Sequence, residues 1–566
     1  MSYRLGVPCS IHDILAQASA LTNACIRNYG PAAPGPLEWA KNAVFYYIVV
    51  RSFGALWLRV SCQGPSIFIR DLYRAGVQYT LHLTKKIPMV RRKIQGELGK
   101  TLSAMEEDIA PVIPGLPPHH ALPDRGREIE DIREELSRLQ ELGNSHWKNG
   151  KVSGTVYHGG EEISKLTSEA YSMFSLSNPL HPDVFPGVRK MEAECVAMVL
   201  AMYNAPMDAG GCLTSGGTES IVMACKAYRD YARDVKGIRT PEMIIPTSAH
   251  AAFDKACKYF HIRPVWIDVD PVTFALPVAR VKKAVNRNTI LIVGSAPGFP
   301  HGIIDDIEGL SKIAKSKNVP LHVDACLGGF LIPFMKDAGY DVPLFDFRLP
   351  GVTSISCDTH KYGFAPKGSS IIMYRTRALR RYQYTVMSDW LGGVYASPGL
   401  AGSRPGALIA GCWSALMRVG HQGYVDSTRR IIACAREIAR IVQDTEGVEV
   451  LGEPQVSVVA FRAIAPLSIY AIGDGMRHRG WNLNALQFPS SLHLACTIPT
   501  IGHEEDFARD LRESIAEARI LLEEKGSAGA AGDSGMAAIY GLAATLPDRS
   551  LIVDVAKGFI DALYKV

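Results

Sequence analysis

From about residue 190 the sequence alternates short apolar runs with helical segments, and this alternation constrains the fold more than any other feature. The helical segments lie near 218–233, 278–286 and 305–317, and the apolar runs occupy 243–245, 265–267, 290–293, 321–323 and 353–356. Strands that are regularly separated by helices form βαβ units, so the pattern predicts a largely parallel sheet covered by helices. Beyond residue 430 the pattern predicts a smaller α/β unit with helices at 427–443, 467–479 and 503–524 and strands at 456–461 and 492–497.

Composition and charge exclude several classes of protein. The chain has 566 residues, 47% apolar and 21% charged, and a net charge of +5, which fits a soluble enzyme and gives no basic face for nucleic acid. None of the 12 cysteines forms a C-x-x-C pair, so we predict neither a zinc cluster nor a disulfide framework, and reduced thiols facing the cytosol. No cleavable secretory signal is evident in the first 35 residues.

The N-terminal region contains an apolar segment at 43–58 with Arg51 inside it. These 16 residues fall short of the roughly 20 that span a bilayer, so a spanning helix and a buried or interfacial helix both stay open. Basic residues follow between 85 and 100; if the helix spans, they keep the rest of the chain in the cytosol, and otherwise they form a solvated linker. Five prolines at 111–123 mark a linker, and apolar residues spaced by three and four at 129–142 predict an amphipathic helix that serves packing only.

Two motifs suit an anionic, nitrogen-containing ligand. The first is the turn Ser215-Gly216-Gly217-Thr218, which precedes a helix whose free N–H groups could hold a phosphate, although an ordinary N-cap turn reads the same way. The second is Asp324, which ends a buried strand, where ligands of open α/β sheets gather, although it could also be a helix cap. His322 and Asp324 lack a third ligand at suitable spacing, so we predict no metal site.

Lys361 follows the strand that ends near residue 356, beside His360. Burial lowers the pKa of a lysine, as a Schiff-base amine requires. A phosphate turn, a strand-end acid and this lysine together supply a phosphate cradle, a partner for a pyridinium nitrogen and a covalent anchor. We therefore predict a pyridoxal 5'-phosphate enzyme in which Lys361 carries the cofactor as a Schiff base and His360 belongs to the cofactor site. His250 also follows a strand and could stack on the cofactor ring, or be a core histidine.

Several longer motifs resemble the sphingosine-1-phosphate lyase family. They are GTVY (154–157), SNPLHPDVFP (177–186), DTHKYGFAPKG (358–368), GGVYASP (392–398), AGSRPG (401–406), GWNLN (480–484) and MAAIYG (536–541). The resemblance runs from about residue 145 to the C-terminus. It implies an α/β fold of the aspartate-aminotransferase type (fold type I), with a large domain built on a mostly parallel sheet and a smaller C-terminal α/β domain.

The resemblance also implies an activity and a set of site residues. The family cleaves phosphorylated long-chain (sphingoid) bases by a retro-aldol reaction into a long-chain aldehyde and phosphoethanolamine, in sphingolipid catabolism. Lys361, Asp324, His250 and Tyr157 are then catalytic, and Asn178 lies on the cofactor side. The residues that bind the substrate are Tyr157, His181, Lys367 and Ser403, and the family implies a homodimer with shared active sites in which Ser403 comes from the partner subunit. A single-pass anchor at the endoplasmic reticulum, with the catalytic part cytosolic, is implied as well.

These features divide the chain into six parts: a tail (1–35), a membrane-anchor helix (36–62), a basic and Pro-rich linker (63–125), an N-terminal segment of the catalytic region (126–190), a large cofactor-binding domain (191–425) and a small C-terminal domain (426–566). Residues 525–535 read as a flexible loop. Two alternatives stay open. One is a pyridoxal-phosphate-dependent amino-acid decarboxylase, which needs a group for a substrate carboxylate. The other is a catalytically silent membrane scaffold, which the intact Lys361 and Asp324 argue against.

Overall fold

The structure, a computed structural model, describes residues 113–142, 147–529 and 549–566, together with shorter stretches between 38 and 111. The chain separates into two units, Met1–Leu72 and Tyr73–Val566. In the first unit, residues 38–47 and 49–50 are helical. No helix within the described ranges combines the length and apolarity needed to cross a bilayer, and residues 51–58 of the predicted anchor lie outside them.

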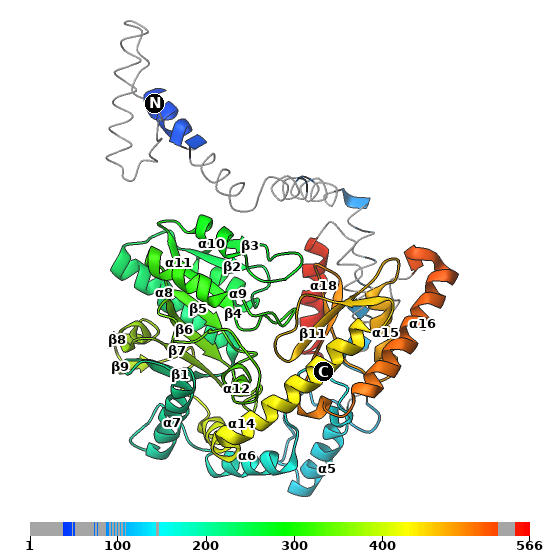
Figure 1. Cartoon of the computed structure of the whole chain (residues 1–566). Coiled ribbons are helices and arrows are strands. Elements are labelled where there is room, and N and C mark those ends of the chain that lie inside the picture. The colour runs from blue at the N-terminus through cyan, green and yellow to red at the C-terminus, as the bar shows by residue number, and fades with distance from the viewer. Residues whose placement is uncertain are drawn as a thin grey trace, which may run out of the picture. The chain divides into compact units, whose positions relative to one another are not determined.

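The larger unit contains a seven-stranded sheet in the order β1-β7-β6-β5-β4-β2-β3 (Figure 1). Its strands are β1 Gly210–Thr214, β2 Glu242–Pro246, β3 Arg263–Ile267, β4 Thr289–Ser295, β5 Leu321–Asp324, β6 Val352–Cys357 and β7 Ser370–Tyr374. The predicted, mostly parallel sheet is confirmed: β3, β2, β4, β5 and β6 pair in parallel, and only β7 runs antiparallel to its neighbours β6 and β1. The alternation did not identify β1 or β7.

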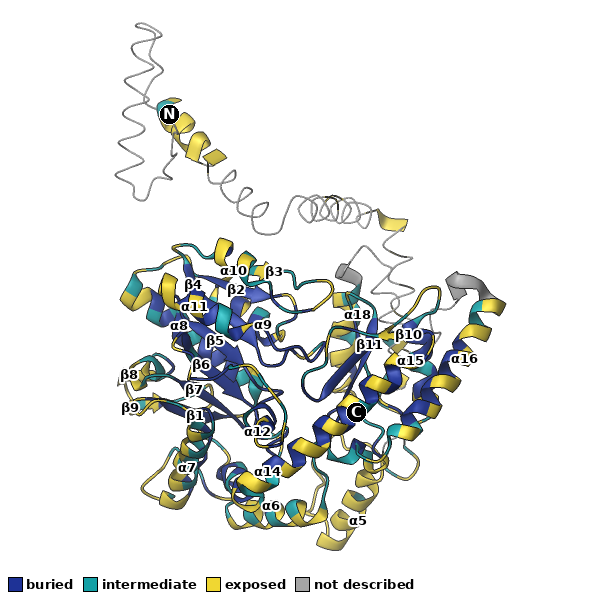
Figure 2. Cartoon of the chain, in the orientation of Figure 1, coloured by how far each residue is buried: buried dark blue, intermediate teal, exposed yellow. Residues whose placement is uncertain are grey.

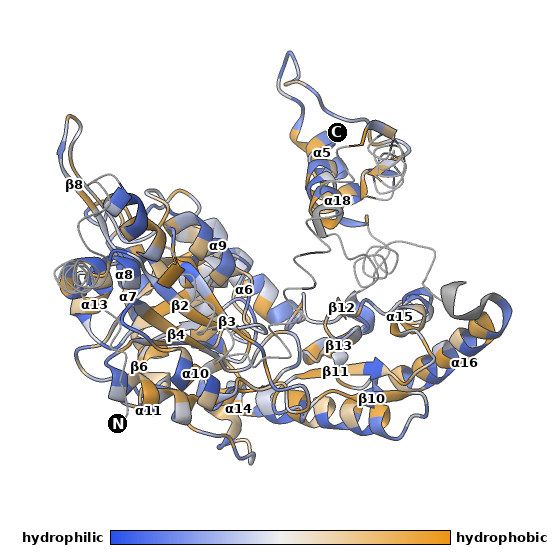
Figure 3. Cartoon of the chain, turned by 90° about the horizontal axis from the view of Figure 1, so that it is seen from above, coloured by the Kyte–Doolittle hydropathy of each residue, from blue (hydrophilic) through white to orange (hydrophobic). Residues whose placement is uncertain are grey.

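Helices from the connections cover this sheet. They are α7 Pro186–Met202, α8 Gly217–Lys236, α9 Ala252–Phe260, α10 Val278–Ala284, α11 Ile307–Lys317, α12 Ile332–Met335 and α13 Arg377–Arg381. All seven residues of β4 are buried, and the central strands are dark in the burial view and largely apolar in the hydropathy view (Figures 2 and 3). Strands covered on both faces read as continuous apolar runs, which is why these strands were visible in the sequence.

The smaller C-terminal region is built on an antiparallel sheet in the order β10-β11-β13-β12. Its elements are β10 Val448–Val450, β11 Val458–Ala463, α15 Ile469–His478, β12 Asn484–Leu486, β13 Ser491–Ala495, the 3-10 turn η2 Ile498–Thr500 and α16 Glu504–Gly529. The last helix includes residues 525–529, so this part of the predicted loop is helical, whereas 530–535 and the motif at 536–541 lie outside the described residues.

A long helix, α14 (Gly406–Gln443), leads from the large sheet to the small one and packs against α7, α16 and α6 (Glu161–Met173). The predicted domain boundary at 425–426 falls inside α14. Gly420, a few residues earlier, interrupts the helical backbone with φ 60° and ψ 177°, a conformation that residues with a Cβ rarely adopt.

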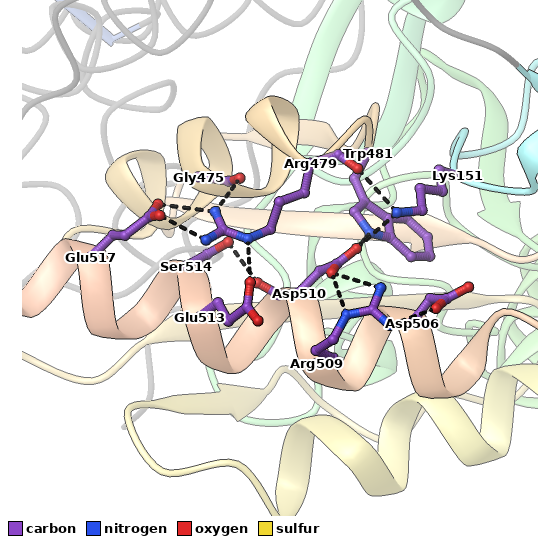
Figure 4. A network of polar contacts seen from close by, with 10 residues as sticks. All are labelled: Lys151, Gly475, Arg479, Trp481, Asp506, Arg509, Asp510, Glu513, Ser514 and Glu517. Carbon is purple, nitrogen blue, oxygen red and sulfur yellow. Dashed lines mark hydrogen bonds and ion pairs between the residues drawn. The ribbon is translucent and has the colours of Figure 1, made fainter.

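Residues 151–157 are held at the edge of the small sheet. Lys151 forms an ion pair with Asp510 of α16 (Nζ to Oδ2, 2.9 Å), and the indole N–H of Trp481 donates to the same oxygen at 2.8 Å (Figure 4). Further along, Val152 bridges to Asn482, and the amide of Gly154 donates to the carbonyl of Ala495. This attachment carries the chain toward Tyr157, whose carbonyl accepts from the amide of Ile498.

Two further elements expose apolar side chains. The helix α5 (Ile129–Gln140) forms as expected, but none of its residues is buried, so the packing expected of its apolar stripe is absent in the single chain. The hairpin β8 (Thr385–Trp390) and β9 (Gly393–Ser397) is likewise mostly exposed. The remaining elements are η1 Trp147–Asn149 and α18 Arg549–Ala562.

Candidate active site

The carboxyl ends of β5 and β6 place Asp324 and Lys361 on the same side of the sheet. Asp324 is the last residue of β5, and its register partner on β6 is Ser356. The segment from Asp358 to Lys361 follows immediately after β6. Parallel neighbours end at the same edge, so the order of the strands explains why residues 37 positions apart in sequence meet here.

The Gly-rich turn leaves β1 and begins α8. Gly216 has φ 154°, and α8 begins at Gly217 without a capping side chain. A Cβ on Gly217 would lie 2.8 Å from both carboxylate oxygens of Asp358 and from the sulfur of Cys326, so a larger residue would collide. An uncapped helix start presents free N–H donors and the positive end of the helix dipole, which suits an anion.

Next to this turn lies His360, which is half-buried. Its ring approaches Gly216, where a Cβ would stand 3.6 Å from Cε1, and its Nδ1 is buried with no hydrogen-bond partner. Ser215 and Thr218 are exposed, and the amide of Ser215 donates to Glu219 Oε2 at 2.8 Å. The unpartnered nitrogen and the free helix start are both groups that a phosphate would satisfy.

The amine of Lys361 is paired with a carboxylate that the sequence reading overlooked. Its Nζ lies 3.0 Å from Oδ2 of Asp358, whose side chain is only 3% exposed. Burial alone would lower the pKa of Lys361, but the negative charge of Asp358 outweighs it and leaves this pKa above its usual value. The expectation that burial leaves the pKa of Lys361 lowered is therefore wrong. Asp358 lies three residues before Lys361 in the sequence, and the two side chains come into contact because the chain turns after β6.

Asp324 is held in a buried position. Its Oδ1 accepts from the amide of Cys326 at 3.0 Å and from the hydroxyl of Ser356 at 3.2 Å. The bond to the Cys326 amide closes a local turn, and the next helix, α12, begins only at Ile332, so Asp324 is not a helix cap. A buried carboxylate next to a lysine anchor still fits a ring nitrogen that must stay protonated.

Tyr157 and Lys367 lie together beside Lys361. The Nζ of Lys367 stands 4.6 Å from the centre of the Tyr157 ring, which packs edge-on against Tyr362 with centres 4.8 Å apart. Burial, followed by the positive charge of Lys361, lowers the pKa of Lys367. Burial also raises the pKa of Tyr157, although the charge of Lys361 opposes this, so the phenol is neutral at pH 7.

Asn178 and Ser403 form a second group. The Nδ2 of Asn178 donates to Oγ of Ser403 at 3.1 Å, and its Oδ1 accepts from the amide of Arg404. The guanidinium of Arg404, which the sequence reading also overlooked, is paired with Glu192 of α7 and fixes this loop. His181 and His250 lie on the surface of the single chain, and Nδ1 of His250 accepts from the amide of Ala252 at the start of α9.

These residues fit pyridoxal phosphate. An uncapped helix start with an unpartnered histidine nitrogen suits the phosphate, Asp324 suits the ring nitrogen, and Lys361 supplies the amine. Within the described part of the chain, no group of three or more His, Cys, Asp or Glu side chains could hold a metal ion. Fold and site together define a pyridoxal-phosphate-dependent enzyme of fold type I.

Comparison with known proteins agrees with this class and narrows it. Residues 114–464 match the pyridoxal-dependent decarboxylase conserved domain. Sphingosine-1-phosphate lyase of Saccharomyces cerevisiae is 46% identical over 527 residues, covering 92% of this chain and 88% of that protein. The Dictyostelium discoideum protein of the same name is 48% identical over 447 residues, covering 79% and 82% of the two chains.

Solved structures give the same result. The sphingosine-1-phosphate lyase of Burkholderia pseudomallei superposes with a TM-score of 0.71 and 43% identity, covering 73% of this chain and 96% of that chain. Glutamate decarboxylase of Lactobacillus brevis, with a TM-score of 0.62, 22% identity and coverage of 71% and 95%, shares the fold. The chain belongs to the sphingosine-1-phosphate lyase family and is a pyridoxal-phosphate-dependent lyase. The expected fold type, cofactor and enzyme class are thereby confirmed.

Proposed function

We propose that this enzyme cleaves phosphorylated long-chain bases into a long-chain aldehyde and phosphoethanolamine. The observation that carries the proposal is a second amine beside the lysine anchor: Lys367 lies over Tyr157, next to Lys361. A substrate of this kind has a phosphate and no carboxylate. A second cation near the anchor suits such a substrate, because phosphate oxygens form strong charge-assisted hydrogen bonds.

The electrostatics of Lys367 favour an anionic ligand. Its pKa is lowered by burial and by the charge of Lys361, so the two ammonium groups repel each other without a ligand. A phosphate dianion between Lys367 and Tyr157 would offset that repulsion, and the neutral phenol would donate a hydrogen bond to it. His181, exposed in the single chain, is a further hydrogen-bond donor in this proposal.

The reaction uses the remaining residues in distinct ways. Bound pyridoxal phosphate supplies an electron-withdrawing ring that accepts the electron pair of the broken carbon–carbon bond. Asp324 would hold the proton on the ring nitrogen, and the amine of Lys361 would be the covalent anchor that holds the cofactor. The turn before α8 and the neighbouring histidine would hold the cofactor phosphate; these residues are Ser215, Gly216, Gly217, Thr218 and His360. Asn178 and His250 would lie on the side of the cofactor ring.

The test is to incubate the purified enzyme with sphingosine 1-phosphate and measure the aldehyde and phosphoethanolamine. We expect Lys367→Met to lower kcat/KM about 100-fold, the cost of removing one partner of a buried charge pair, while the cofactor absorbance is retained. Lys283→Met, on the exposed face of α10, is the matched control. Carbon dioxide release from amino acids, with no aldehyde formed, would establish a decarboxylase instead.

A homodimer with shared sites is the second part of the proposal. The hairpin β8–β9 immediately precedes the Ser403 loop and exposes large apolar side chains, including Trp390 (58%), Leu391 (105%) and Val394 (76%). Exposed apolar patches mark interfaces, and a C₂ dimer is the commonest closed assembly. If Ser403 completes the partner's site, mixing Lys361→Ala and Ser403→Ala chains should restore one intact site per heterodimer. Absence of rescue would mean that each chain builds its own site.

The third part is attachment to the endoplasmic reticulum membrane through the N-terminal region, with the catalytic part in the cytosol. The support is sequence alone: the apolar, aromatic-rich segment 43–58 and the basic residues that follow it. Deleting residues 1–60 should release active enzyme from membranes. Full-length enzyme that stays in solution without detergent would rule the anchor out.

A further inference from the structure

A chain of buried polar groups runs behind Asp324, away from Lys361. The hydroxyl of Tyr228 lies 2.6 Å from Oγ of Ser354, which lies 2.7 Å from Nδ1 of His322. On the other side of the imidazole, Nε2 lies 3.1 Å from Oγ of Ser356, which donates to Oδ1 of Asp324 at 3.2 Å. We refer to Tyr228, Ser354, His322 and Ser356 as the buried relay.

The relay is buried, and its members lie on regular secondary structure. All four of its side chains are 0% exposed, and Asp324 itself is 7% exposed. Tyr228 comes from α8, which packs on β6 (Figure 1). His322 on β5 and Ser354 on β6 are register partners, and the register partner of Ser356 is Asp324. Groups on the sheet and its covering helix move less than groups on loops, so they can hold a neighbour in place.

The direction of every proton in the relay follows from its last member. Ser356 donates its one hydroxyl proton to Oδ1 of Asp324, so it must itself accept from His322. His322 therefore carries its proton on Nε2 and accepts at Nδ1 from Ser354, which in turn accepts from Tyr228. Hydrogen bonds that point one way polarise one another, so each of them strengthens the last bond to Asp324.

A neutral imidazole is what this arrangement needs. Burial lowers the pKa of His322 to about 4, although the charge of Asp324 acts in the opposite direction. A protonated imidazole would donate from both nitrogens and would reverse the bond to Ser354. A neutral His322 keeps all the hydrogen bonds of the relay pointing toward Asp324, and it places no positive charge near that carboxylate that could compete with the ring nitrogen.

We propose that His322 and Ser356 are positioning residues that hold the Asp324 carboxylate aimed at the ring nitrogen of the cofactor. The inference rests on the proposed pairing of Asp324 with that nitrogen and adds the groups that maintain it. The relay touches neither the substrate nor the cofactor, and it acts only through Asp324.

The test compares the affinity of the apoenzyme for two probes, pyridoxal phosphate and the analogue with C–H in place of the ring nitrogen. We expect Ser356→Ala, His322→Gln and Tyr228→Phe to weaken binding of pyridoxal phosphate, on the order of tenfold for Ser356→Ala, which loses a hydrogen bond to a charged group. Binding of the analogue should be unchanged. Tyr374→Phe, which removes a buried hydroxyl of β7 that donates to Gln383 and not to the relay, is the control and should alter neither.

Different failures have different meanings. If the variants bind both probes more weakly by the same factor, the relay serves packing alone, and the inference is overturned. If Asp324→Asn does not discriminate between the probes, the pairing with the ring nitrogen is wrong and the inference falls with it. Nitrogen-15 NMR of His322 needs no variant: the neutral Nε2–H tautomer between about pH 6 and 8 is expected, and an Nδ1–H or cationic ring would contradict the relay.

Discussion

Replacing Asp358 by Asn removes the charge beside the Lys361 amine while nearly preserving the side-chain shape. The two groups are 3.0 Å apart, with side chains 3% and 21% exposed. At an effective dielectric constant of about 20, their attraction is about 5 kcal/mol, and breaking a buried pair from one side costs about 3–5 kcal/mol. Because Lys361 is partly exposed, solvent screens its charge, and we expect the apoenzyme to lose about 2 kcal/mol of unfolding free energy at pH 7.

The loss should depend on pH in a defined direction. In the native chain the pKa of Lys361 is raised, so the pair's contribution is complete at neutral pH and is lost only as the pH rises through the folded-state pKa. In the variant, burial, the largest influence on this pKa, is no longer opposed by the charge of Asp358 and lowers the pKa, so the penalty is largest at low pH and diminishes as the amine loses its proton. The difference in Tm between the two proteins should therefore shrink as the pH rises from about 6 to 9.

The assay is thermal unfolding of the apoenzyme across this range, with Asp444→Asn, at an exposed ion pair with Arg440, as the control. A second readout is the rate at which Lys361 captures pyridoxal phosphate, which requires a neutral amine and should be faster in the variant at pH 7. A Tm difference that does not change with pH, or slower capture, would refute the role assigned to Asp358.

Three further variants test other parts of the structure. Lys361→Ala should abolish turnover and any borohydride-reducible attachment of the cofactor; an adduct that survives would place the anchor elsewhere. Gly420→Ala should cost about 1–3 kcal/mol, because its backbone conformation suits only glycine; an unchanged Tm would show that α14 can straighten. Lys151→Met leaves Asp510 buried without its ammonium partner and should lower both the Tm and kcat. Burial raises the pKa of Asp510, but the hydrogen bonds that it accepts, led by the one from Lys151, leave this pKa below its usual value. The stabilisation by the ion pair is therefore lost as the pH falls, and the difference in Tm between the variant and the native protein should shrink in acid.

The large sheet could be predicted because its strands are covered on both faces. Runs such as 290–293 are continuously apolar and stand between helices, so their period and spacing identify them. Strand β7 could not be found by that rule, since it runs antiparallel to its neighbours and follows β6 after a turn rather than a helix. Strand β1 stands between two helices, but its sequence, GGCLT, is not a continuous apolar run. The apolar stripe of α5 could be predicted from the spacing of its apolar residues, but this spacing shows only that one face of the helix is apolar and does not identify what packs against it.

The candidate site likewise contains some features that the sequence reveals and others that only the folded chain brings together. The positions of Asp324 and Lys361 at the ends of β5 and β6 could be predicted because strand ends are local properties of the sequence, and their roles stay predictions. Asp358 was missed because an acid three residues before a lysine is common, and only the turn after β6 brings the two side chains together. The relay behind Asp324 was missed for a related reason: its members come from three elements, and hydroxyl groups on buried strands look like ordinary small residues until the register is known.

The position of Tyr157 shows how the site depends on chain segments that are far apart in sequence. Lys361 and Lys367 belong to the large sheet, whereas the backbone of Tyr157 is fixed to the small sheet through Gly154 and Ile498. Contact between Tyr157 and Lys367 therefore requires both sheets to be in place, and α14 is the element that links them along the chain. A change in the small region, far from Lys361, can thus weaken the proposed phosphate site without touching the anchor. For the same reason, the loss of kcat expected for Lys151→Met should leave the cofactor absorbance intact.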